Sequence, residues 1–406
     1  MGCVNACVWR GVFIVNVFII NGFRADNFLF KIRSGPVNTV ADDTPWVLQF
    51  CHGYDGPFLD CARQYAVLFS GTAYKVCTVY LTGEADSNVE RGSASDEVIF
   101  LGYNSNQVRG LKLEAMLRLK KIVAGRHFKL CIAHRFKPIY IALLATHLPV
   151  VGVHHAFGVY QRMLRRFFVN LFRSRLHLVG VSNAVRDELK QYFPAWPPHR
   201  IRTLYNRINV PEIQAEQVPR AAARTFLNLP EDAWVIGNVG RLHADKDQAT
   251  LIHGFAKALP NLPPAAILAI MGSGKLEVKL KKLACELGIS ERVLFLGQIM
   301  QGRRYFKAFD VFVLSSDHEP FGMVLLEAMA ASIPLICSDC GGGREVVDGV
   351  GQLFPFGDST ALAGCLQQQT MMPYNADLVR SRLISVFSDE AAKIQFCYFK
   401  DLLDNG

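Results

Sequence analysis

The chain has 406 residues, of which half are hydrophobic and about a fifth are charged. This composition is typical of a globular α/β protein, and the length exceeds what one hydrophobic core usually holds. The net charge of +9 is uneven, because residues 1–212 carry 26 Lys and Arg against 14 Asp and Glu, whereas the remainder carries 18 against 21. The eleven Cys follow no disulfide framework, so we expect free thiols in a reducing compartment.

Residues 1–44 form a predicted N-terminal extension. Within it, Val12–Ile20 is apolar but too short to span a membrane, and Arg10 and Arg24 bracket it. No clear small-residue cleavage site follows, so a signal peptide is the weaker alternative. We therefore expect a poorly ordered extension ahead of the folded domains.

From Trp46 onward, short apolar runs alternate with helical segments, which predicts a parallel sheet covered on both faces. The expected strands are residues 47–51, 76–81, 97–101, 130–133, 150–153 and 176–181, and the main expected helices are residues 58–69, 111–123 and 139–145. These segments form a first Rossmann-like domain over residues 45–212. The pattern then loosens around residues 206–220, which we interpret as a linker.

A second alternating set predicts another doubly wound domain over residues 213–386. Its expected strands are residues 234–239, 266–270, 293–296, 311–314 and 335–338, and its expected helices are residues 248–258, 276–287 and 322–331. A final helix is expected within residues 387–404. Two such domains in tandem would form a cleft at the carboxyl ends of their sheets, where ligands bind.

The second domain opens with a glycine loop that contains two basic residues. Gly240 would let the backbone approach a ligand closely, and Arg241 and Lys246 would supply counter-charges for a diphosphate. A solvated loop is the alternative. Asp247 is better placed as a helix N-cap than as a metal ligand.

The segment 315–330 places one acid at the start of a helix and another inside it. The expected helix after Gly322 is apolar on nearly every side, which indicates a buried helix. Glu327 within it would be costly to bury without a partner, and Glu319 lies in the loop before it. Free N–H groups at the helix start favour an anion. The sequence therefore predicts a polar ligand between the two glutamates.

From Gly237 to about Leu362 the chain resembles the nucleotide-sugar half of glycosyltransferases with two facing Rossmann-like domains, the GT-B fold. Within them it is similar to the large retaining Glu-x7-Glu family (group 1, family four), which includes bacterial lipopolysaccharide-core and cell-surface polysaccharide enzymes. The matching residues are Gly240-Arg241-Leu242, Lys246, Gly272-Ser273-Gly274, Glu319-Pro320-Phe321-Gly322, Glu327-Ala328-Met329-Ala330, Pro334 and Gly341-Gly342-Gly343-Arg344-Glu345. The first half is similar more loosely, through Gly53, Gly56, His134, His154-His155 and Val181-Ser182-Asn183.

The resemblance implies a role for each matching residue. Arg241 and Lys246 would hold the diphosphate, Glu319 would bind donor-sugar hydroxyls, and Glu327 would bind the ribose. Further donor-binding residues would be Gly53, Gly240, Gly272, Phe321, Gly322, Met323 and Val324. The closing helix would cross back to the first domain. Glu345 has a structural alternative, as a helix cap or a partner of Arg344.

The resemblance also places histidines on the acceptor side. His154 or His155 would lie near the reacting sugar, and we favour His154 for this catalytic role. His134 and His155 would then face the acceptor. A core histidine is the alternative reading of His134.

The resemblance implies a retaining, metal-independent transferase that moves a hexose from a nucleotide sugar to a saccharide or lipid-linked acceptor, without a cofactor. No carboxylate nucleophile stands out, so we expect departure and attack on one face of the sugar. A nucleotide-sugar epimerase of similar fold and a catalytically silent scaffold are the alternatives. Intact Arg241, Lys246, Glu319 and Glu327 argue against the scaffold.

Residues 160–177 carry five arginines and no acid, with apolar residues near helical spacing. A basic, aromatic amphipathic helix suits an anionic membrane surface, although its apolar face could pack in the core instead. We therefore expect a cytoplasmic protein, peripheral on the inner face of the cytoplasmic membrane. Nucleic acid is not an expected partner, because no RNA-binding module or base-stacking pattern accompanies the positive charge.

Overall fold

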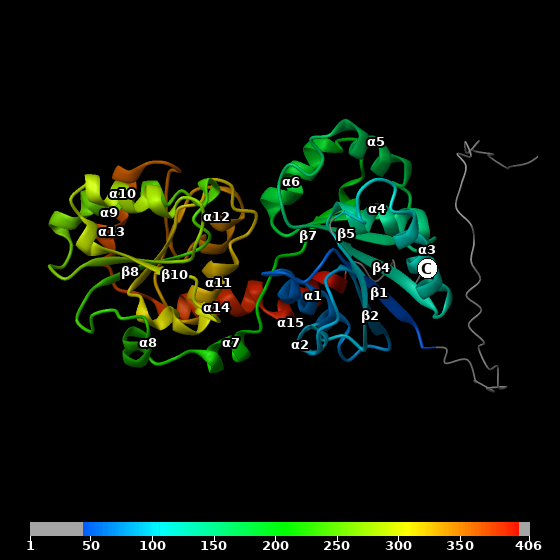
Figure 1. The fold of residues 1–406 in the computed structure, drawn as a ribbon, viewed down its shortest axis with the longest axis horizontal. Coiled ribbons are helices and arrows are strands. Elements are labelled where there is room, and N and C mark those ends of the chain that lie inside the picture. The colour runs from blue at the N-terminus through cyan, green and yellow to red at the C-terminus, as the bar shows by residue number, and fades with distance from the viewer. Residues whose placement is uncertain (1–43, 105, 398–406) are drawn as a thin grey trace, which may run out of the picture. The chain divides into compact units, whose positions relative to one another are not determined.

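The computed structural model describes residues 44–104 and 106–397. The extension predicted over residues 1–44 thus lies outside the described residues, apart from Thr44. Two parallel β-sheets, each with helices packed around it, make up the described part of the chain (Figure 1). In that part, no helix combines the length and the apolar character needed to cross a bilayer.

The first sheet has the strand order β3-β2-β1-β4-β5-β6-β7, and all its neighbouring strands are parallel. Its strands are β1 (Trp46–Cys51), β2 (Lys75–Thr82), β3 (Glu97–Tyr103), β4 (Phe128–His134), β5 (Val150–His154), β6 (Leu176–Gly180) and β7 (Ile201–Thr203). The central strands are almost wholly buried, as expected when helices cover both faces. The order reverses between β1 and β4, so the loops after these strands flank a topological switch point.

The helices around this sheet are α1 (Phe58–Ala66), α2 (Ser87–Gly92), α3 (Leu113–Ala124), α4 (Phe136–Ala145), α5 (Met163–Leu171) and α6 (Asn183–Tyr192). The sequence did not predict α2 or α6. Both begin at a side-chain cap, Asp86 and Ser182 respectively, and bury only one or two residues. The helix predicted over residues 160–177 is too long, because α5 ends at Leu171 and His177 lies in β6.

The second sheet repeats this pattern with the order β10-β9-β8-β11-β12-β13, again with parallel neighbours. Its strands are β8 (Val235–Val239), β9 (Ile267–Met271), β10 (Val293–Gly297), β11 (Val311–Leu314), β12 (Leu335–Ser338) and β13 (Gln352–Phe354). The order reverses between β8 and β11. The loops after these two strands contain Lys246 and Glu319, so the sheet topology brings these residues together.

The helices of this second half are α9 (Gln248–Ala258), α10 (Glu277–Glu286), the 3-10 helix η6 (Gly302–Ala308), α11 (Met323–Ala330), α12 (Gly341–Val347), α13 (Ser359–Gln369) and α14 (Ala376–Phe387). Along the chain, α7 (Val210–Glu216) and α8 (Arg220–Phe226) come after the last strand of the first sheet and before the first strand of the second. The linker predicted over residues 206–220 is therefore partly helical. Asn209 caps α7, and the helix buries Val210 and Ile213. Two buried residues in so short a helix do not form a periodic pattern that the sequence could reveal.

The last described helix, α15 (Asp389–Phe396), lies within residues 387–404, where the sequence predicted a final helix, and packs on the first half of the chain. The ring of Phe396 lies 5.4 Å from that of Phe69, centre to centre. The Asp389 carboxylate pairs with Arg63, at 3.2 Å, and with Arg207, at 2.8 Å. Figure 1 shows α14 beside α11 in the second half and α15 beside α1 in the first. The chain thus returns to the first half after completing the second sheet.

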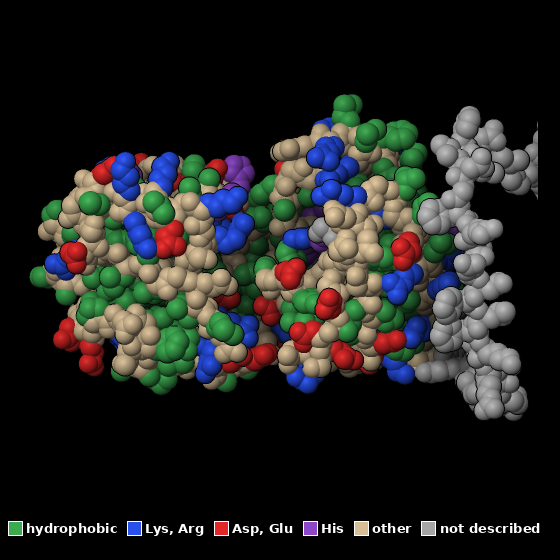
Figure 2. Space-filling model, viewed as in Figure 1, with side chains coloured by type: hydrophobic (Ala, Val, Ile, Leu, Met, Phe, Trp, Pro, Cys, Tyr) green, Lys and Arg blue, Asp and Glu red, His purple; other side chains and the backbone are tan. Residues whose placement is uncertain are grey.

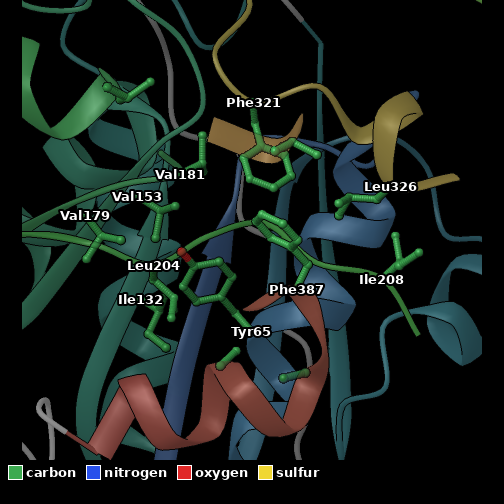
Figure 3. Packing of buried hydrophobic residues seen from close by; sticks show 14 of the residues in the cluster. Tyr65, Ile132, Val153, Val179, Val181, Leu204, Ile208, Phe321, Leu326 and Phe387 are labelled. Carbon is green, nitrogen blue, oxygen red and sulfur yellow. The ribbon is translucent and has the colours of Figure 1, made fainter. Parts of the chain in front are cut away.

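An aromatic cluster packs around Phe321, which follows Glu319 by two residues, and Figure 3 shows Phe321 next to Phe387. The Phe387 ring centre lies 5.8 Å from that of Phe321 and 5.5 Å from that of Tyr205. Phe321 and Phe387 are almost wholly buried, and burying such a ring contributes roughly 1.5–3 kcal/mol. The loop that carries Glu319 is therefore anchored by the end of α14.

Candidate functional site

Glu319 lies in the loop between β11 and α11, where its carboxylate is only 10% exposed. It accepts hydrogen bonds from the Lys246 ammonium, at 2.7 Å, and from the Ser316 hydroxyl, at 3.2 Å. Lys246 comes from the loop after β8. Two residues that the sequence assigned to one site are therefore in direct contact.

Two consecutive glycines support the backbone of the Glu319 loop. A Cβ atom on Gly341 would lie 2.3 Å from the carbonyl oxygen of Glu319, and one on Gly342 would lie 2.3 Å from that of Pro320. The Gly342 amide donates a hydrogen bond to the Glu319 carbonyl at 2.7 Å. Only residues without a Cβ allow this approach, so the start of α12 fixes the position of the Glu319 loop.

Helix α11 is not buried on every side, which corrects the prediction from its sequence. Its fully buried residues are Leu325, Leu326, Ala328, Met329 and Ala330. Met323, Val324 and Glu327 are only partly buried and form one stripe at helical spacing. Burial raises the pKa of Glu327 to about 7, an effect that the nearby Arg303 charge only partly offsets.

A cavity of about 740 Å³ opens beside Glu327. Glu327, Arg241 and the backbone of Gly240 and Gly272 line it, and Asp60 reaches it from α1 in the first half of the chain. This volume lies within the range of cavities that hold small-molecule ligands. Arg241, Gly240, Gly272 and Glu327, which the sequence assigned to donor binding, therefore share one cavity.

Two glycine loops interlock along one side of the cavity. Gly272 has a φ of +142°, and a Cβ atom on it would lie 1.9 Å from the carbonyl oxygen of Gly240. A Cβ atom on Gly274 would lie 2.3 Å from the carbonyl oxygen of Leu242. The loops after β8 and β9 are thus in backbone contact, and their exposed peptide groups can approach a ligand closely.

Arg241 extends into solvent beside these loops. Its guanidinium is 72% exposed and pairs with Asp245 at 3.3 Å. Burial alone would raise the pKa of Asp245, but the hydrogen bond with His243 and the charge of Lys246 outweigh burial and lower it. Asp247 caps α9 by accepting a hydrogen bond from the Thr250 amide at 3.3 Å, which confirms the predicted N-cap. Nowhere in residues 44–104 or 106–397 do three or more His, Cys, Asp or Glu form a group that could hold a metal.

Arg303 is a cavity residue that the sequence did not reveal. Its guanidinium forms two hydrogen bonds with Glu216, at 2.9 and 3.2 Å, and lies 3.9 Å from Asp60. It also contributes a positive charge beside Glu327. It directly follows Gly302, at the start of η6, and belongs to none of the motifs described above.

His154 and His155 have different surroundings. His154 is 1% exposed, and its Nε2 atom lies 3.3 Å from the Tyr160 hydroxyl. Its Nδ1 atom has no hydrogen-bond partner in the described part of the chain. His155 is partly exposed, but its nitrogens contact His134, at 3.1 Å, and the Cys61 sulfur, at 3.8 Å. Burial lowers the pKa of both histidines to about 3, so both rings are neutral near pH 7. The choice between them as the sugar-facing residue stays a prediction.

His134 is buried among aromatic rings. It is 3% exposed, stacks on His155 with ring centres 5.4 Å apart, and meets the edge of Tyr65 at 4.9 Å. This burial favours the core-histidine alternative, and the expected place of His134 on the acceptor side stays a prediction. Burial lowers its pKa, so it is neutral.

Three other predicted residues act through their backbone. A Cβ atom on Gly53 would lie 2.8 Å from the Thr82 hydroxyl oxygen, so Gly53 allows the loops after β1 and β2 to meet, and it does not line the cavity. The Phe321 ring is 2% exposed, which leaves only its backbone for a ligand. Gly322 starts α11 with a φ of +93°.

Glu345 caps a helix in the other half of the chain, which confirms the structural alternative. Its carboxylate accepts hydrogen bonds from the amides of Asn183, at 2.8 Å, and Ala184, at 2.7 Å, both at the start of α6. The Tyr205 hydroxyl donates a third, at 2.9 Å. Arg344 pairs instead with Asp339.

Two family models match the chain. The model for glycosyl transferases group 1 matches residues 219–369, which include the whole second sheet, and the model for glycosyltransferase family 4 matches residues 73–211. The chain is 34% identical over 177 residues to the lipopolysaccharide core biosynthesis glycosyltransferase LpsE of Rhizobium meliloti, which covers 42% of this chain and 51% of that protein. It is 33% identical over 174 residues to an uncharacterized glycosyltransferase of Methanocaldococcus jannaschii, which covers 42% of this chain and 44% of that protein. The matches thus span about half the length of these relatives.

Solved structures resemble the described chain over nearly its whole length. A glycosyltransferase from Rickettsia africae has a TM-score of 0.77 at 16% identity and covers 90% of this chain and 100% of its own. Anabaena Alr3699/HepE, in complex with UDP and glucose, has a TM-score of 0.67 at 19% identity and covers 87% of this chain and 99% of its own. The two facing doubly wound domains are those of the GT-B fold, as the sequence predicted.

Proposed function

The chain belongs to the glycosyltransferases of group 1 and family 4, and on this premise we propose that it transfers a hexose from a nucleotide-diphosphate sugar to a saccharide or lipid-linked acceptor. The process would be the synthesis of lipopolysaccharide core or of another cell-surface glycan. The name of the Rhizobium meliloti relative supports this acceptor class, and the UDP and glucose in the Anabaena structure support the donor class.

The observation that carries the proposal is the 740 Å³ cavity with glycine backbone along one side and the Glu327 carboxylate facing into it. In the proposed complex, Glu327 accepts hydrogen bonds from the ribose hydroxyls. The glycine loops, which include Gly240 and Gly272, let the diphosphate approach the backbone. A carboxylate that is costly to ionise here gains two neutral donors from a ribose.

Arg241 and Lys246 would bind the diphosphate. The Arg241 guanidinium is largely exposed and paired only weakly with Asp245, so it can form a bidentate contact with phosphate oxygens. Lys246 would stabilise negative charge on the departing nucleotide, which is where electrostatic catalysis acts most strongly. We propose that these two cations supply the positive charge that a metal supplies in other transferases.

Glu319 would orient the donor sugar rather than attack it. Its carboxylate is enclosed and already accepts hydrogen bonds from Lys246 and Ser316, so it is suited to accept hydrogen bonds from sugar hydroxyls as well. We therefore propose retention by departure and attack on the same face of the sugar, with the leaving diphosphate helping to take the acceptor proton. His154, whose Nδ1 atom has no partner in the described chain, would contact the sugar.

The lipid-linked acceptor would be reached at a membrane surface. Helix α5 presents Leu164, Phe167 and Leu171 to solvent, with side chains 84%, 65% and 63% exposed. Figure 2 shows hydrophobic side chains standing over α5 above a run of Lys and Arg. An exposed apolar stripe beside basic residues favours peripheral binding to an anionic bilayer, and we propose the inner face of the cytoplasmic membrane.

Incubation with radiolabelled nucleotide sugars and membrane extract tests the proposal. Label transferred into a saccharide or lipid fraction, with release of nucleoside diphosphate, supports it. Interconversion of the free nucleotide sugar without transfer would indicate an epimerase instead. A thermal-shift panel of uridine, guanosine and adenosine diphosphates identifies the base, since a specific ligand stabilises the folded chain by mass action.

A further inference from the structure

Four basic side chains gather around the start of α4, outside the 740 Å³ cavity. We call them the α4 cation cluster, and they are Lys112, Arg135, Lys137 and Arg165. Two of them stack on aromatic rings of α4. The Arg165 guanidinium carbon lies 4.6 Å from the Phe136 ring centre, and the Lys112 ammonium lies 4.7 Å from the Tyr140 ring centre. Lys112, at the start of α3, and Arg165, in α5, thus both lie against aromatic rings of α4.

Arg135 lies where the strand order of the first sheet reverses. It follows β4 directly, and its amide donates a hydrogen bond to the Val153 carbonyl at 3.0 Å. Its guanidinium carbon lies 3.6 Å from the centre of the Phe58 ring, which starts α1. The backbone φ of +72° is one that residues other than glycine rarely adopt. The side chain is therefore held beside the switch point between β1 and β4, the usual ligand position in such sheets.

The α4 cation cluster has little negative charge of its own. In the described part of the chain, no carboxylate forms an ion pair with any of its members. Asp55 is the acid whose charge acts on Arg135. Burial lowers the pKa of Lys112, and the charges of Lys137 and Arg165 lower it further. Lys112, Lys137 and Arg165 therefore lie near one another, with Arg135 two residues before Lys137, and they lack a full set of counter-charges. A bound anion would relieve their repulsion.

Helix α4 adds to this positive potential. Its first turn contains no acid, and no side chain caps its free N–H groups. A lysine in the first turn is unfavourable with the helix dipole unless an anion is bound there. The dipole and the four side chains therefore favour the same ligand charge.

We propose that the α4 cation cluster binds a phosphate group of the acceptor. This inference rests on the proposed function. Arginine guanidinium groups bind phosphate with two parallel hydrogen bonds, and lysines add point charges. A phosphate dianion or a diphosphate neutralises more of the cluster than a single carboxylate would. The same Phe58 ring that holds Arg135 also meets the edge of His155, with centres 5.9 Å apart, so the phosphate would lie beside the predicted acceptor side.

Two sources of phosphate fit this chemistry. Arg162, next to Arg165, continues the positive charge toward the exposed face of α5, so the phosphate of a membrane lipid could enter from that direction. A soluble sugar phosphate would enter from solvent. Geranyl diphosphate and glucose 1-phosphate represent these two sources in the experiment.

The test measures binding of inorganic pyrophosphate to the full chain by phosphorus NMR, in an Arg241→Ala/Lys246→Ala background that removes the donor-side cations. Adding Arg135→Gln/Lys137→Gln should weaken binding at least about tenfold, because two charged hydrogen-bond donors are lost. Adding Lys120→Gln/Lys121→Gln, which removes the same charge from the exposed side of α3, should change binding less than twofold. Competition by geranyl diphosphate or glucose 1-phosphate supports the site and identifies the source.

Equal pyrophosphate binding in the cluster and control variants, or competition by neither probe, would overturn the proposal. Thermal unfolding curves establish that each variant is folded. Donor binding is measured separately, as the thermal stabilisation of the Arg135→Gln/Lys137→Gln variant by nucleoside diphosphates. If no nucleoside diphosphate stabilises the wild-type chain, the proposed function fails. If nucleotides bind but pyrophosphate binds the cluster and control variants equally, only this further inference fails.

Discussion

The Lys246 ammonium lies 2.7 Å from Oε2 of Glu319, and both side chains are largely removed from solvent, at 19% and 10% exposed. Neither group has enough water to stabilise its charge alone. Their attraction offsets much of the desolvation, and the Ser316 hydroxyl satisfies a further lone pair of the carboxylate. The pair therefore holds the loops after β8 and β11 in register at the switch point of the second sheet.

Breaking this pair from one side should destabilise the fold more than removing both charges. Lys246→Met leaves Glu319 as an unpaired, nearly buried carboxylate, and we expect a loss of about 3 kcal/mol. Lys246→Met/Glu319→Gln should regain most of that loss, because no charge remains. Urea denaturation of the two single variants and the double variant measures the coupling. Strictly additive losses would contradict a direct pair.

Glu319→Ala should also abolish sugar transfer, and its nucleotide binding should change little. The reason is that Glu319 is assigned to the sugar, whereas Glu327 is assigned to the ribose. Initial rates with a radiolabelled nucleotide sugar, together with thermal shifts from the free nucleoside diphosphate, separate the two effects. Full transfer activity in the Glu319→Ala variant would refute its assigned role.

The residues of this site were predictable to the extent that they lie in short local motifs. Arg241, Lys246, Glu319 and Glu327 occur at fixed spacings after buried strands, and the parallel topology brings such loops together. Arg303 was not predictable in this way. Its contact with Asp60 joins η6 to α1, residues 243 positions apart in the chain, and no periodicity in either segment signals the meeting.

Stability should fall as pH rises through the range in which Glu327 ionises. Burial raises the pKa of Glu327 to about 7 from an ordinary value of 4.5, so the folded chain binds more protons than the unfolded chain between these values. The contribution is complete below pH 4.5 and is lost as pH approaches 7. The difference in unfolding free energy between Glu327→Gln and the wild type should therefore favour the variant by about 2–3 kcal/mol more at pH 8 than at pH 4.5. Urea unfolding at both pH values checks this, and parallel pH profiles would contradict it.

Gly342→Ala should displace the Glu319 loop. The added Cβ would lie 2.3 Å from the Pro320 carbonyl oxygen, a backbone atom that cannot move without shifting the neighbouring Glu319. We expect a stability loss of about 1–3 kcal/mol and at least tenfold slower transfer. Gly364→Ala, in the interior of α13 with open space around the new methyl, should gain about 0.5–1 kcal/mol. Similar losses from both substitutions would refute the packing argument.

Glu345→Ala should weaken the contact between α12 and α6. It removes the acceptor of three hydrogen bonds, from two amides at the start of α6 and from the Tyr205 hydroxyl. A lost helix cap costs about 1 kcal/mol, and the third bond should bring the loss to roughly 1–3 kcal/mol. Arg344→Ala, in the same helix but in an exposed ion pair, should cost less than about 0.5 kcal/mol. Chemical denaturation distinguishes the two variants.

The fold was predictable where strands are buried runs and helices are long and periodic. Helix α6 was missed because only Val185 and Leu189 are buried among its ten residues, so its apolar pattern is weak. Helix α5 was predicted too long for the opposite reason, since apolar and basic residues continue past its end. There the Arg175 guanidinium hydrogen-bonds the carbonyls of Thr146 and Leu148, which holds the chain as it turns into β6.

Substitution of the exposed apolar stripe of α5 should reduce membrane binding. Leu164 and Phe167 are 84% and 65% exposed, and each apolar side chain contributes up to roughly 1.5–3 kcal/mol when it is removed from water. Partial insertion in a bilayer yields part of that, so Leu164→Ser/Phe167→Ser should lower partitioning onto anionic vesicles at least about tenfold. Co-sedimentation with vesicles of phosphatidylglycerol and phosphatidylcholine measures it.

Val278→Ser/Ile394→Ser is the matched control for this stripe, because its two residues are 81% and 73% exposed but lie on α10 and α15, away from basic α5. Partitioning of the control should stay within about twofold of the wild type. Binding should also weaken with salt, since Arg162 and Arg173 are exposed beside the stripe and each basic residue contributes about 1 kcal/mol at an anionic surface. Equal losses in stripe and control variants would show that the vesicles bind exposed apolar residues regardless of position, and α5 would then have no special role.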